Sequence, residues 1–385
     1  MSRAPSTGPP GTADVVVVGG GVIGSAVARS LAAGNVATCV VDREEIPGAA
    51  TWASAGMLSP IGEGLRKGPF LELGLRGLRA YPGLVAELKE ETGVDVGYHP
   101  SGKVQVALAE EGAESLRERA AWGARQGFQT RWISRDELRR ELPELTHRAR
   151  GGLLIPEDHQ VENRALGPAL RTAAQRKGAQ WVPGREVRRV LIRKGSVEGV
   201  ELSDGSRITS STIVLAAGAW SGGIAGLPRP LPVRPVRGQM VALHPASPVS
   251  TAMVGSPSLY LVPRRDGRLL AGATMEEVGF ESHPTAGGVA RMLEGAMELF
   301  PSLAHARLAE SWAGLRPGTP DALPVLGPDP EVRGLLYATG HFRNGILLAP
   351  VTAQIISGLV LYGDPGVELA PFRPHRFAAS QAHRR

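Results

Sequence analysis

The spacing of hydrophobic positions near the start of the chain predicts an α/β unit. Residues 14–18 are almost wholly β-branched, which is typical of a strand buried on both faces of a parallel sheet. Residues 25–33 are small and apolar with helical spacing, and Gly34 ends that helix. Residues 37–41 predict a second strand, which Asp42 closes. The order strand, helix, strand indicates parallel pairing.

Farther along the chain, helical and alternating patterns follow one another. Amphipathic spacing predicts helices over residues 70–92, 110–126, 134–142, 163–177 and 287–300. Apolar runs and alternation predict strands over residues 103–109, 197–208 (a hairpin turning at Asp204-Gly205), 213–215, 239–243, 260–263, 268–272 and 335–338. The apolar stretch 345–362 contains Pro350 and several polar residues, so we expect a buried helix and not a membrane span.

The α/β pattern brackets a β-rich middle, which predicts an α/β protein with an inserted domain. We expect a Rossmann-like nucleotide domain assembled from separated segments, and a substrate domain with helices and a mixed or antiparallel sheet. The expected boundaries are 14–92, 158–230 and 313–372 for the nucleotide domain, 93–157 and 231–312 for the substrate domain, and 1–13 and 373–385 for a disordered and a basic tail.

Composition narrows the class of protein. The chain has 385 residues with a formal net charge of +6, and its basic residues are scattered, so we expect no nucleic-acid partner. Cys39 is the single cysteine, which excludes an intrachain disulfide and suits a reducing cytoplasm. We interpret Cys39 as a small buried residue in a strand. The first 13 residues lack the apolar region of a secretory signal.

Three glycines follow the first predicted strand with the spacing G-x-G-x-x-G. Gly19 permits a tight turn, Gly21 lets the backbone approach a pyrophosphate, and Gly24 lets the helix pack on the strand. Asp42 comes eighteen residues after Gly24, about where a carboxylate accepts hydrogen bonds from ribose hydroxyls. That charge would repel a 2′-phosphate, which argues against NADP. The alternative is a glycine-rich turn that binds nothing.

A second glycine turn, at residues 340–350, begins the last apolar helix more than 300 residues later. A chain that returns to its first domain to build a helix N-terminus is typical of a flavoprotein. Reduced flavin is an anion, and the N-terminus at Gly345, Ile346 and Leu347 would stabilise its charge.

Several side chains have both a chemical and a structural interpretation. Arg316, after an apolar strand, either forks onto a carboxylate ligand or pairs with a protein acid. Tyr260 is either a core tyrosine or a substrate contact, and Arg343 either caps backbone carbonyls or lies near flavin and substrate. Met57 and Met275 are either core or pocket residues.

Other segments give weaker signals. The small residues before Trp220, including Gly218, either let the backbone approach a cofactor or pack closely against protein. The run 157–159 has the residue types of a metal cluster but fits a polar turn better, and the histidines lack metal spacing. No strong candidate for a general base stands out, which suits direct hydride transfer to flavin.

Five stretches together resemble the amino-acid oxidase branch of FAD-dependent oxidoreductases, and within it the bacterial glycine oxidases of thiazole (thiamine) biosynthesis. They are residues 18–28, 53–58, 260–264 with 272–275, 312–319, and 340–350. The resemblance extends over residues 14–369. Asp42 is shorter than the glutamate usual at its position, and Ser258 stands where some relatives have a histidine near the pocket mouth.

This resemblance implies non-covalent FAD and oxidation of small amino acids by oxygen, in a cytoplasmic homotetramer that acts beside a thiazole synthase. The substrate carboxylate would bind Arg316 and Tyr260, with Arg343 close by and Met57 and Met275 lining the pocket. Residues implied to contact FAD are Gly19, Gly21, Val22, Ile23, Gly24, Asp42, Arg43, Thr51, Ser54, Gly56, Met57, Val187, Gly218, Trp220, His341, Arg343, Asn344, Gly345, Ile346 and Leu347.

Two rival functions fit the same residues. One is a D-amino-acid or sarcosine-type oxidase, or a dehydrogenase that passes electrons to a quinone. The other is a flavoprotein subunit that binds FAD for assembly or electron relay without catalysis of its own. The sequence alone leaves the preferred amine and the reactivity with oxygen open.

Overall fold

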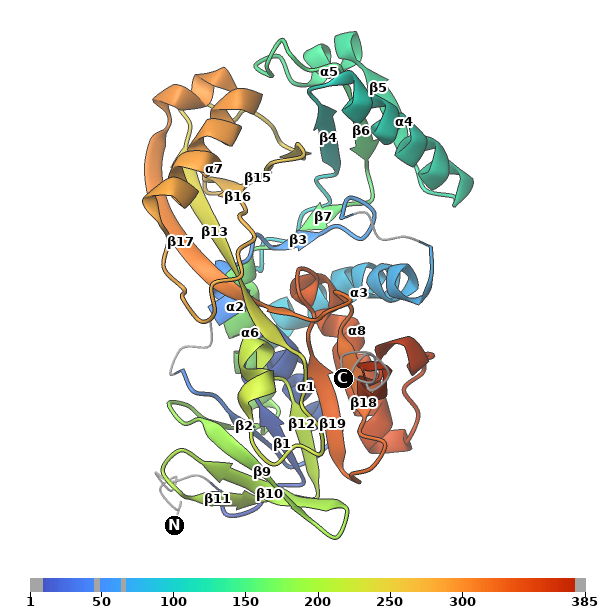
Figure 1. Ribbon diagram of the computed structural model, residues 1–385, viewed down its shortest axis with the longest axis vertical. Coiled ribbons are helices and arrows are strands. Elements are labelled where there is room, and N and C mark those ends of the chain that lie inside the picture. The colour runs from blue at the N-terminus through green and yellow to red at the C-terminus, as the bar shows by residue number, and fades with distance from the viewer. Residues whose placement is uncertain (1–9, 45–48, 64–66, 378–385) are drawn as a thin grey trace, which may run out of the picture.

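A computed structural model describes residues 10–44, 49–63 and 67–377 of the chain. The molecule is elongated, with the six-stranded sheet toward one end and the eight-stranded sheet toward the other; helices α2, α3, α6 and α8 lie in the middle, and α4, α5 and α7 lie at the upper end (Figure 1). Most of the two predicted tails, residues 1–9 and 378–385, lies outside the described part of the chain.

The first sheet has six strands in the order β18-β19-β12-β1-β2-β8. Its strands are β1 (Val15–Val18), β2 (Thr38–Val41), β8 (Gln180–Val182), β12 (Thr212–Leu215), β18 (Val325–Pro328) and β19 (Leu335–Thr339). All neighbours pair in parallel except β18 with β19. The predicted parallel unit, in which helix α1 (Val22–Ala33) follows β1, is therefore confirmed.

Both faces of this sheet are buried, which explains the continuous apolar run in β1. Val15 and Val17 face the helices α1, α3 (Pro69–Thr92), α6 (Asn163–Arg176) and α8 (Gly345–Tyr362). Val16 and Val18 face the opposite way, toward a three-stranded sheet of β9 (Val187–Arg193), β10 (Ser196–Leu202) and β11 (Arg207–Thr209). Cys39 lies on this second face, and burial raises the pKa of its thiol to about 12, so the interpretation as an inert core residue is confirmed.

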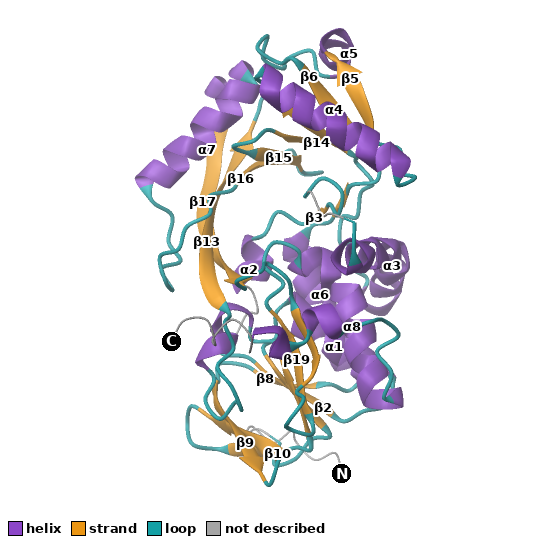
Figure 2. Ribbon diagram, turned by 45° about the vertical axis from the view of Figure 1, so that its right-hand side comes forward, coloured by secondary structure: helices purple, strands orange, loops and turns teal. Residues whose placement is uncertain are grey.

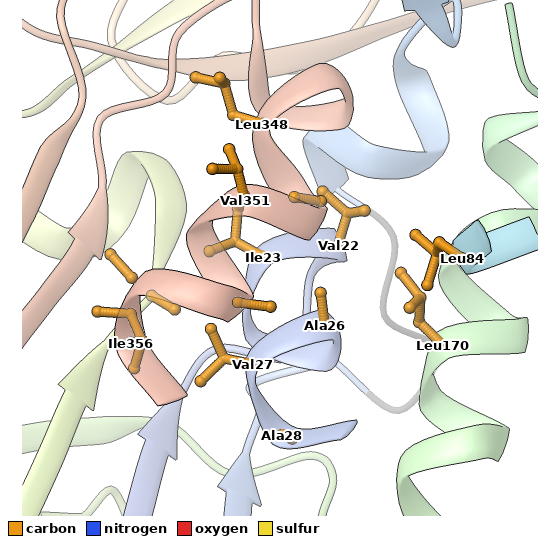
Figure 3. Close-up of a cluster of buried hydrophobic side chains, with 14 of the residues drawn as sticks. Val22, Ile23, Ala26, Val27, Ala28, Leu84, Leu170, Leu348, Val351 and Ile356 are labelled. Atoms are coloured by element: carbon orange, nitrogen blue, oxygen red, sulfur yellow. The ribbon is translucent and has the colours of Figure 1, made fainter. Parts of the chain in front are cut away.

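Helix α8 packs in the centre of the helical layer. Figure 3 shows Leu348, Val351 and Ile356 of α8 close to Ile23 and Val27 of α1. Among the helices in the described ranges, α8 alone is long and apolar enough to cross a bilayer, judged by length and composition. Its contacts with α1 and α3 bury most of it inside the fold, which explains its apolar composition.

The second sheet has eight strands in the order β17-β13-β16-β15-β14-β4-β6-β5. They are β4 (Lys103–Ala107), β5 (Arg131–Ser134), β6 (Gly151–Ile155), β13 (Arg234–His244), β14 (Met253–Gly255), β15 (Tyr260–Pro263), β16 (Leu269–Gly272) and β17 (Arg307–Gly318). The pairing is antiparallel except between β14 and β4, so the sheet is mixed, as predicted.

One face of this sheet is covered by helix α7 (Ala286–Leu299), as Figure 2 shows, and the other faces the centre of the molecule. Helices α4 (Glu110–Arg125) and α5 (Arg135–Glu141) lie near its β5–β6 edge. The remaining elements are α2 (Ala49–Ala53), the short pair β3 (Met57–Leu58) and β7 (His159–Gln160), and the 3₁₀ turns η1 (Gly218–Gly223), η2 (Pro301–His305), η3 (Ala370–Phe372) and η4 (Pro374–Phe377).

The structure corrects one detail of the sequence analysis. Arg316 does not follow its strand but lies inside β17, which continues to Gly318. There it pairs with Val236 of β13 along an edge of the eight-stranded sheet. A position within the strand fixes the direction of the Arg316 side chain by the sheet alternation.

Candidate functional site

A cavity of about 550 Å³ lies between the two sheets and is lined by segments from the whole length of the chain. The glycine loop after β1, the start of α8 and residues 216–220 line one part. Strands β4, β13, β14, β15, β16 and β17 line the other. The two halves of the candidate site therefore come from different sheets.

The glycine loop is shaped for an approaching phosphate group. A Cβ on Gly24 would lie 1.8 Å from the Gly19 carbonyl oxygen, so α1 packs on the strand only with glycine there, as predicted. Gly21 lines the cavity, and a Cβ on Gly21 would lie 3.4 Å from its nearest neighbour, the Thr51 hydroxyl. The Thr51 hydroxyl accepts a hydrogen bond from the amide of Val22 (2.9 Å). The predicted residue Thr51 thus helps hold the loop in place.

Asp42 ends β2 beside the same loop. Its carboxylate accepts hydrogen bonds from the amide of Gly20 and from the amide of Glu44 (2.8 Å). Burial raises the pKa of this carboxyl, and the two backbone hydrogen bonds oppose that shift. Asp42 lines the cavity, so its remaining acceptor capacity faces the space where a ribose would lie.

Other predicted cofactor contacts also line the cavity. They are Gly19, Val22, Ile23, Arg43, Ser54, Gly56, Met57, Val187, Gly218, Trp220, His341, Arg343, Gly345 and Ile346. The Arg43 guanidinium lies 4.2 Å from the ring centroid of Trp220, and Phe280 stacks on the same ring. Gly56 has a φ of +63°, and a Cβ there would lie 1.9 Å from the Val161 carbonyl oxygen.

At the start of α8, Gly345 and Ile346 line the cavity, whereas the neighbouring Asn344 and Leu347 do not. Asn344 and Leu347 are buried beside it, and Leu347 belongs to the core cluster around α1. His341 is buried, and its Nε2 lies 3.0 Å from the Thr352 hydroxyl. Burial lowers the pKa of His341 to about 3, so this ring is neutral at physiological pH.

Arg316 enters the cavity from β17 and lies directly over the backbone of Gly238. A Cβ on Gly238 would approach the guanidinium group to 2.1 Å, so the arginine needs glycine beneath it. Its Nη1 donates a hydrogen bond to the Thr274 carbonyl oxygen (3.1 Å). No acidic residue of the described ranges forms an ion pair with Arg316. The guanidinium therefore retains donors for a ligand.

Tyr260 lies close to this arginine. Its hydroxyl is 3.9 Å from the Met240 sulfur. Removal from solvent raises the pKa of Tyr260, and the charge of Arg316 opposes the shift. A neutral phenol next to a guanidinium offers one further donor to a carboxylate.

The two predicted pocket methionines differ in exposure. Met57 is half-buried in the cavity wall, whereas Met275 is 62% exposed and lies at the mouth together with exposed Ser258. Met275 is therefore not a core residue. Arg343, the third residue predicted to be catalytic, forms an ion pair with Glu63 across the cavity wall.

Sequence reasoning missed a polar group behind this wall. Lys103 is only 3% exposed, and its Nζ lies 3.9 Å from a Glu63 oxygen and 3.5 Å from the Ser59 hydroxyl. Ser59 donates a hydrogen bond to Asp158, which also accepts one from the Gly62 amide (3.1 Å). The only sequence signal was the polar run at 157–159. No metal cluster occurs within the described ranges, and this run forms part of the protein wall.

Comparison with known proteins places the chain among flavoproteins. A family model described as FAD dependent oxidoreductase matches residues 14–359. The glycine oxidase of Geobacillus kaustophilus is 36% identical over 93% of this chain and 96% of its own length. The crystal structure of glycine oxidase from that organism superposes with a TM-score of 0.91, covering 95% of this chain and 99% of that one.

Two further relatives have different names. A "Bifunctional protein ThiO/ThiG" of a Synechocystis strain is 39% identical over 95% of this chain, and the chain spans 54% of that relative's length. The chain thus covers about half of the bifunctional relatives that it matches. "Hydrogen cyanide synthase subunit HcnC" of Pseudomonas aeruginosa is 34% identical over 96% of this chain and 98% of its own length.

Proposed function

This chain belongs to the family of FAD-dependent oxidoreductases, with FAD as its cofactor, and from that premise we propose that it oxidises glycine and other small amino acids such as sarcosine and D-alanine. For glycine the balanced reaction consumes one oxygen and one water, and gives glyoxylate, ammonia and hydrogen peroxide. The glycine oxidases among the relatives, which match nearly their whole length, support this proposal.

The residues of the cavity fit FAD. Gly19, Gly21 and the start of α1 would hold the pyrophosphate, because both glycines and the first residues of the helix line the cavity. Asp42 would accept hydrogen bonds from a ribose. Cys39, the single cysteine, is buried in β2, so we propose that FAD is held without a covalent bond to sulfur.

Arg316 carries the proposal for the substrate. The side chain lies in the cavity, hydrogen-bonds to a backbone carbonyl and leaves its charge without a protein carboxylate in the described part of the chain. A guanidinium in a cavity favours an anionic ligand, and its planar fork binds a carboxylate through two parallel hydrogen bonds. Tyr260 would add a third hydrogen bond.

The protein residues position the substrate and leave its amine to lose a proton before reaction. FAD, when bound, accepts the hydride of the α-carbon and returns the two electrons to oxygen. The neutral His341 and the ion-paired Glu63 and Arg343 surround the reacting region without a free base among them. Binding in a fixed orientation is therefore the main contribution of these side chains.

The bifunctional relatives suggest a use for the product. Those relatives are named for two functions and the chain spans about half of their length, so we propose that the imine passes to a separate thiazole synthase. We also propose a cytoplasmic homotetramer.

The decisive experiment is anaerobic reduction of the purified holoprotein. Glycine, sarcosine and D-alanine should bleach the flavin absorption, and air should restore it with formation of one hydrogen peroxide for each substrate oxidised. Bleaching that persists in air would indicate a dehydrogenase. A flavin that none of the amines reduces would contradict the proposed function.

The relative from hydrogen cyanide synthase favours a second candidate, a flavoprotein subunit that acts only in a complex. That relative covers the chain as fully as the glycine oxidases do. The same anaerobic titration separates the two, because a dependent subunit would bind FAD but remain oxidised with every amine when tested alone.

A further inference from the structure

The eight-stranded sheet presents one row of residues to the cavity. In register across the sheet, Met240 pairs with Gly272, Gly272 with Tyr260, Tyr260 with Gly255, and Gly255 with Gln105. All five line the cavity. The two glycines leave space above the sheet, since a Cβ on Gly272 would lie 3.1 Å from the Tyr260 hydroxyl. The row therefore forms a floor that connects the region of Arg316 and Tyr260 to β4.

Two cations stand at the β4 end of this floor. Lys103 is two residues from Gln105 on β4, so both side chains lie on the cavity face. Arg119 of α4 donates to the Gln105 side-chain oxygen (2.6 Å) and to the Ile61 carbonyl oxygen (3.1 Å). The backbones of strands β15 and β4 are two strand spacings apart, on the order of 10 Å. Side chains that extend toward each other from the two strands span a shorter distance.

The Lys103 amine is positioned by polar residues on the side away from the cavity. Ser59 and Asp158 lie beneath it, and Asp158 is completely buried. A Cβ on Gly62 would lie 2.1 Å from an Asp158 oxygen and 2.9 Å from Cδ of Lys103, so glycine lets the loop pack closely over the group and a larger residue would displace these side chains. Burial raises the pKa of Asp158 to about 6, which leaves it ionised at neutral pH and able to compensate part of the lysine charge.

The charges of this half of the cavity are unbalanced. Among the residues that the structure describes, four cations line it: Lys103, Arg119, Arg316 and Arg343. The carboxylates that face them are Glu63, which is shared between Arg343 and Lys103, and the buried Asp158. Buried charges are costly unless they are paired. One substrate carboxylate on Arg316 leaves one cation in excess, and a second carboxylate would balance the set.

We propose that Lys103 and Arg119 form a second anion subsite, which makes this chain an oxidase of amino acids that carry a second carboxylate on the amine, such as iminodiacetate. The inference rests on the proposed function, because Arg316 must hold the first carboxylate. The carbon–hydrogen bond next to nitrogen breaks and its hydride reduces the bound flavin. Water cleaves the resulting carbon–nitrogen double bond to glyoxylate and glycine, and oxygen takes the two electrons to give hydrogen peroxide.

Two ethers test the subsite without turnover. Methoxyacetate and oxydiacetate have the same skeleton and differ by one carboxylate, and neither carries an oxidisable amine. Each is titrated into the holoprotein while the visible flavin spectrum is followed. We expect oxydiacetate to bind at least about tenfold more tightly, equivalent to about 1.4 kcal/mol. Equal affinities would overturn the proposal without any variant.

Lys103→Met should weaken oxydiacetate at least about tenfold more than methoxyacetate, and Lys103→Gln repeats the test should the first variant fold poorly. The matched control is Lys89→Met, an exposed lysine of α3 far from the cavity lining, which should change neither ligand. An unchanged ratio in both Lys103 variants would overturn the subsite.

Turnover then compares sarcosine with iminodiacetate, which differ by the same carboxylate. We expect a higher kcat/KM for iminodiacetate in the parent protein and loss of that preference in Lys103→Met. The proposed function fails separately: in that case methoxyacetate leaves the spectrum unchanged and no amine reduces the flavin. If methoxyacetate binds through Arg316 but the second carboxylate gives no gain, only the subsite fails.

Discussion

The two halves of the cavity are built in different ways. The half beside the six-stranded sheet presents much backbone: Gly19 and Gly21, the first turn of α1 and the start of α8. The half beside the eight-stranded sheet is formed largely by side chains of strands β4, β13, β15 and β17, among them Arg316, Tyr260 and Lys103. The first half therefore depends on open space and on backbone amides that are free to bind a ligand. The second half depends on the strand register that places its side chains.

This difference predicts how each half responds to mutation. A backbone cradle is damaged mainly by added atoms, and the damage affects cofactor retention. A side-chain wall is damaged by removed charges, and the damage affects substrate while the flavin stays bound. Variants that change both properties together would contradict this separation of the two halves.

Replacement of Arg316 should have the largest effect. Arg316→Met keeps most of the volume and removes the charge, and loss of one partner of a buried pair typically costs about 3–5 kcal/mol. We expect kcat/KM for glycine to fall roughly 10²–10³-fold, since about 1.4 kcal/mol corresponds to tenfold. Bound flavin and its spectrum should be retained. Arg316→Lys should restore only part of the activity, because an ammonium lacks the planar fork. Near-normal turnover in the methionine variant would refute the role of Arg316.

Asp42 tests the cofactor half. Asp42→Ala removes the acceptor for the amides of Gly20 and Glu44 as well as the proposed ribose contact. Charge-assisted hydrogen bonds are worth about 1.5–3 kcal/mol each, so we expect weaker FAD binding by at least tenfold. Titration of the apoprotein with FAD measures it. Asp42→Asn keeps one acceptor oxygen, so its FAD affinity should lie between those of the parent protein and Asp42→Ala. An FAD affinity that is unchanged in both variants would exclude a role of Asp42 in binding the cofactor.

Gly62 offers a way to damage the substrate half by adding a single carbon. Gly62→Ala would drive a methyl group into Asp158, Ser59 and Lys103, and overpacking of this kind costs about 1–3 kcal/mol. We expect a lower melting temperature and weaker binding of dicarboxylates, with FAD affinity retained.

The control for this variant is Gly83→Ala in α3. A Cβ at Gly83 meets no atom within 4 Å, so the alanine should stabilise the helix by about 0.5–1 kcal/mol. A melting temperature that Gly62→Ala leaves unchanged or raises, as expected for Gly83→Ala, would show that the wall around Gly62 tolerates the methyl group.

His341 predicts a smaller, pH-dependent effect. Burial lowers the pKa of His341 in the folded protein to about 3, below the ordinary histidine value of 6.5, so the unfolded chain binds more protons between these values. The stability contributed by the neutral ring is therefore complete above about pH 6.5 and is lost as the pH falls toward 3, with a slope of up to about 1.4 kcal/mol per pH unit. Denaturant unfolding of the holoprotein at pH 7 and pH 5 should show this loss. His341→Gln should reduce the pH dependence, and an identical dependence in the variant would contradict the assignment.

Met275 should matter least for stability and act on selectivity. The side chain is largely exposed at the cavity mouth, so Met275→Ala should change the free energy of unfolding by less than about 0.5 kcal/mol. A wider entrance should favour bulkier D-amino acids over glycine in kcat/KM. An unchanged order of preference would mean that the mouth does not select the substrate.

Most of the secondary structure could be predicted from the sequence. Helices α3, α4, α6 and α8 lie within one or two residues of their predicted bounds, because each has a long run with helical period. Strands β3, β5 to β9, β14 and β18 were not predicted. Most of them are short, and the longer β9 lacks a regular alternation of apolar and polar residues. The end of strand β17 was predicted too early, so Arg316 was expected after the strand and not inside it.

The sequence by itself determined the cofactor half, because a glycine loop between a strand and a helix is a local signal: its spacing, the following strand and Asp42 occur within thirty residues. Only the tertiary structure decided the substrate half. Lys103, Glu63, Asp158 and Arg119 lie in four separate segments, and nothing near any of them in sequence indicates the others. They meet because strand pairing brings β4 beside β6 and β14, and a pairing between distant strands leaves no trace in the local order of residues.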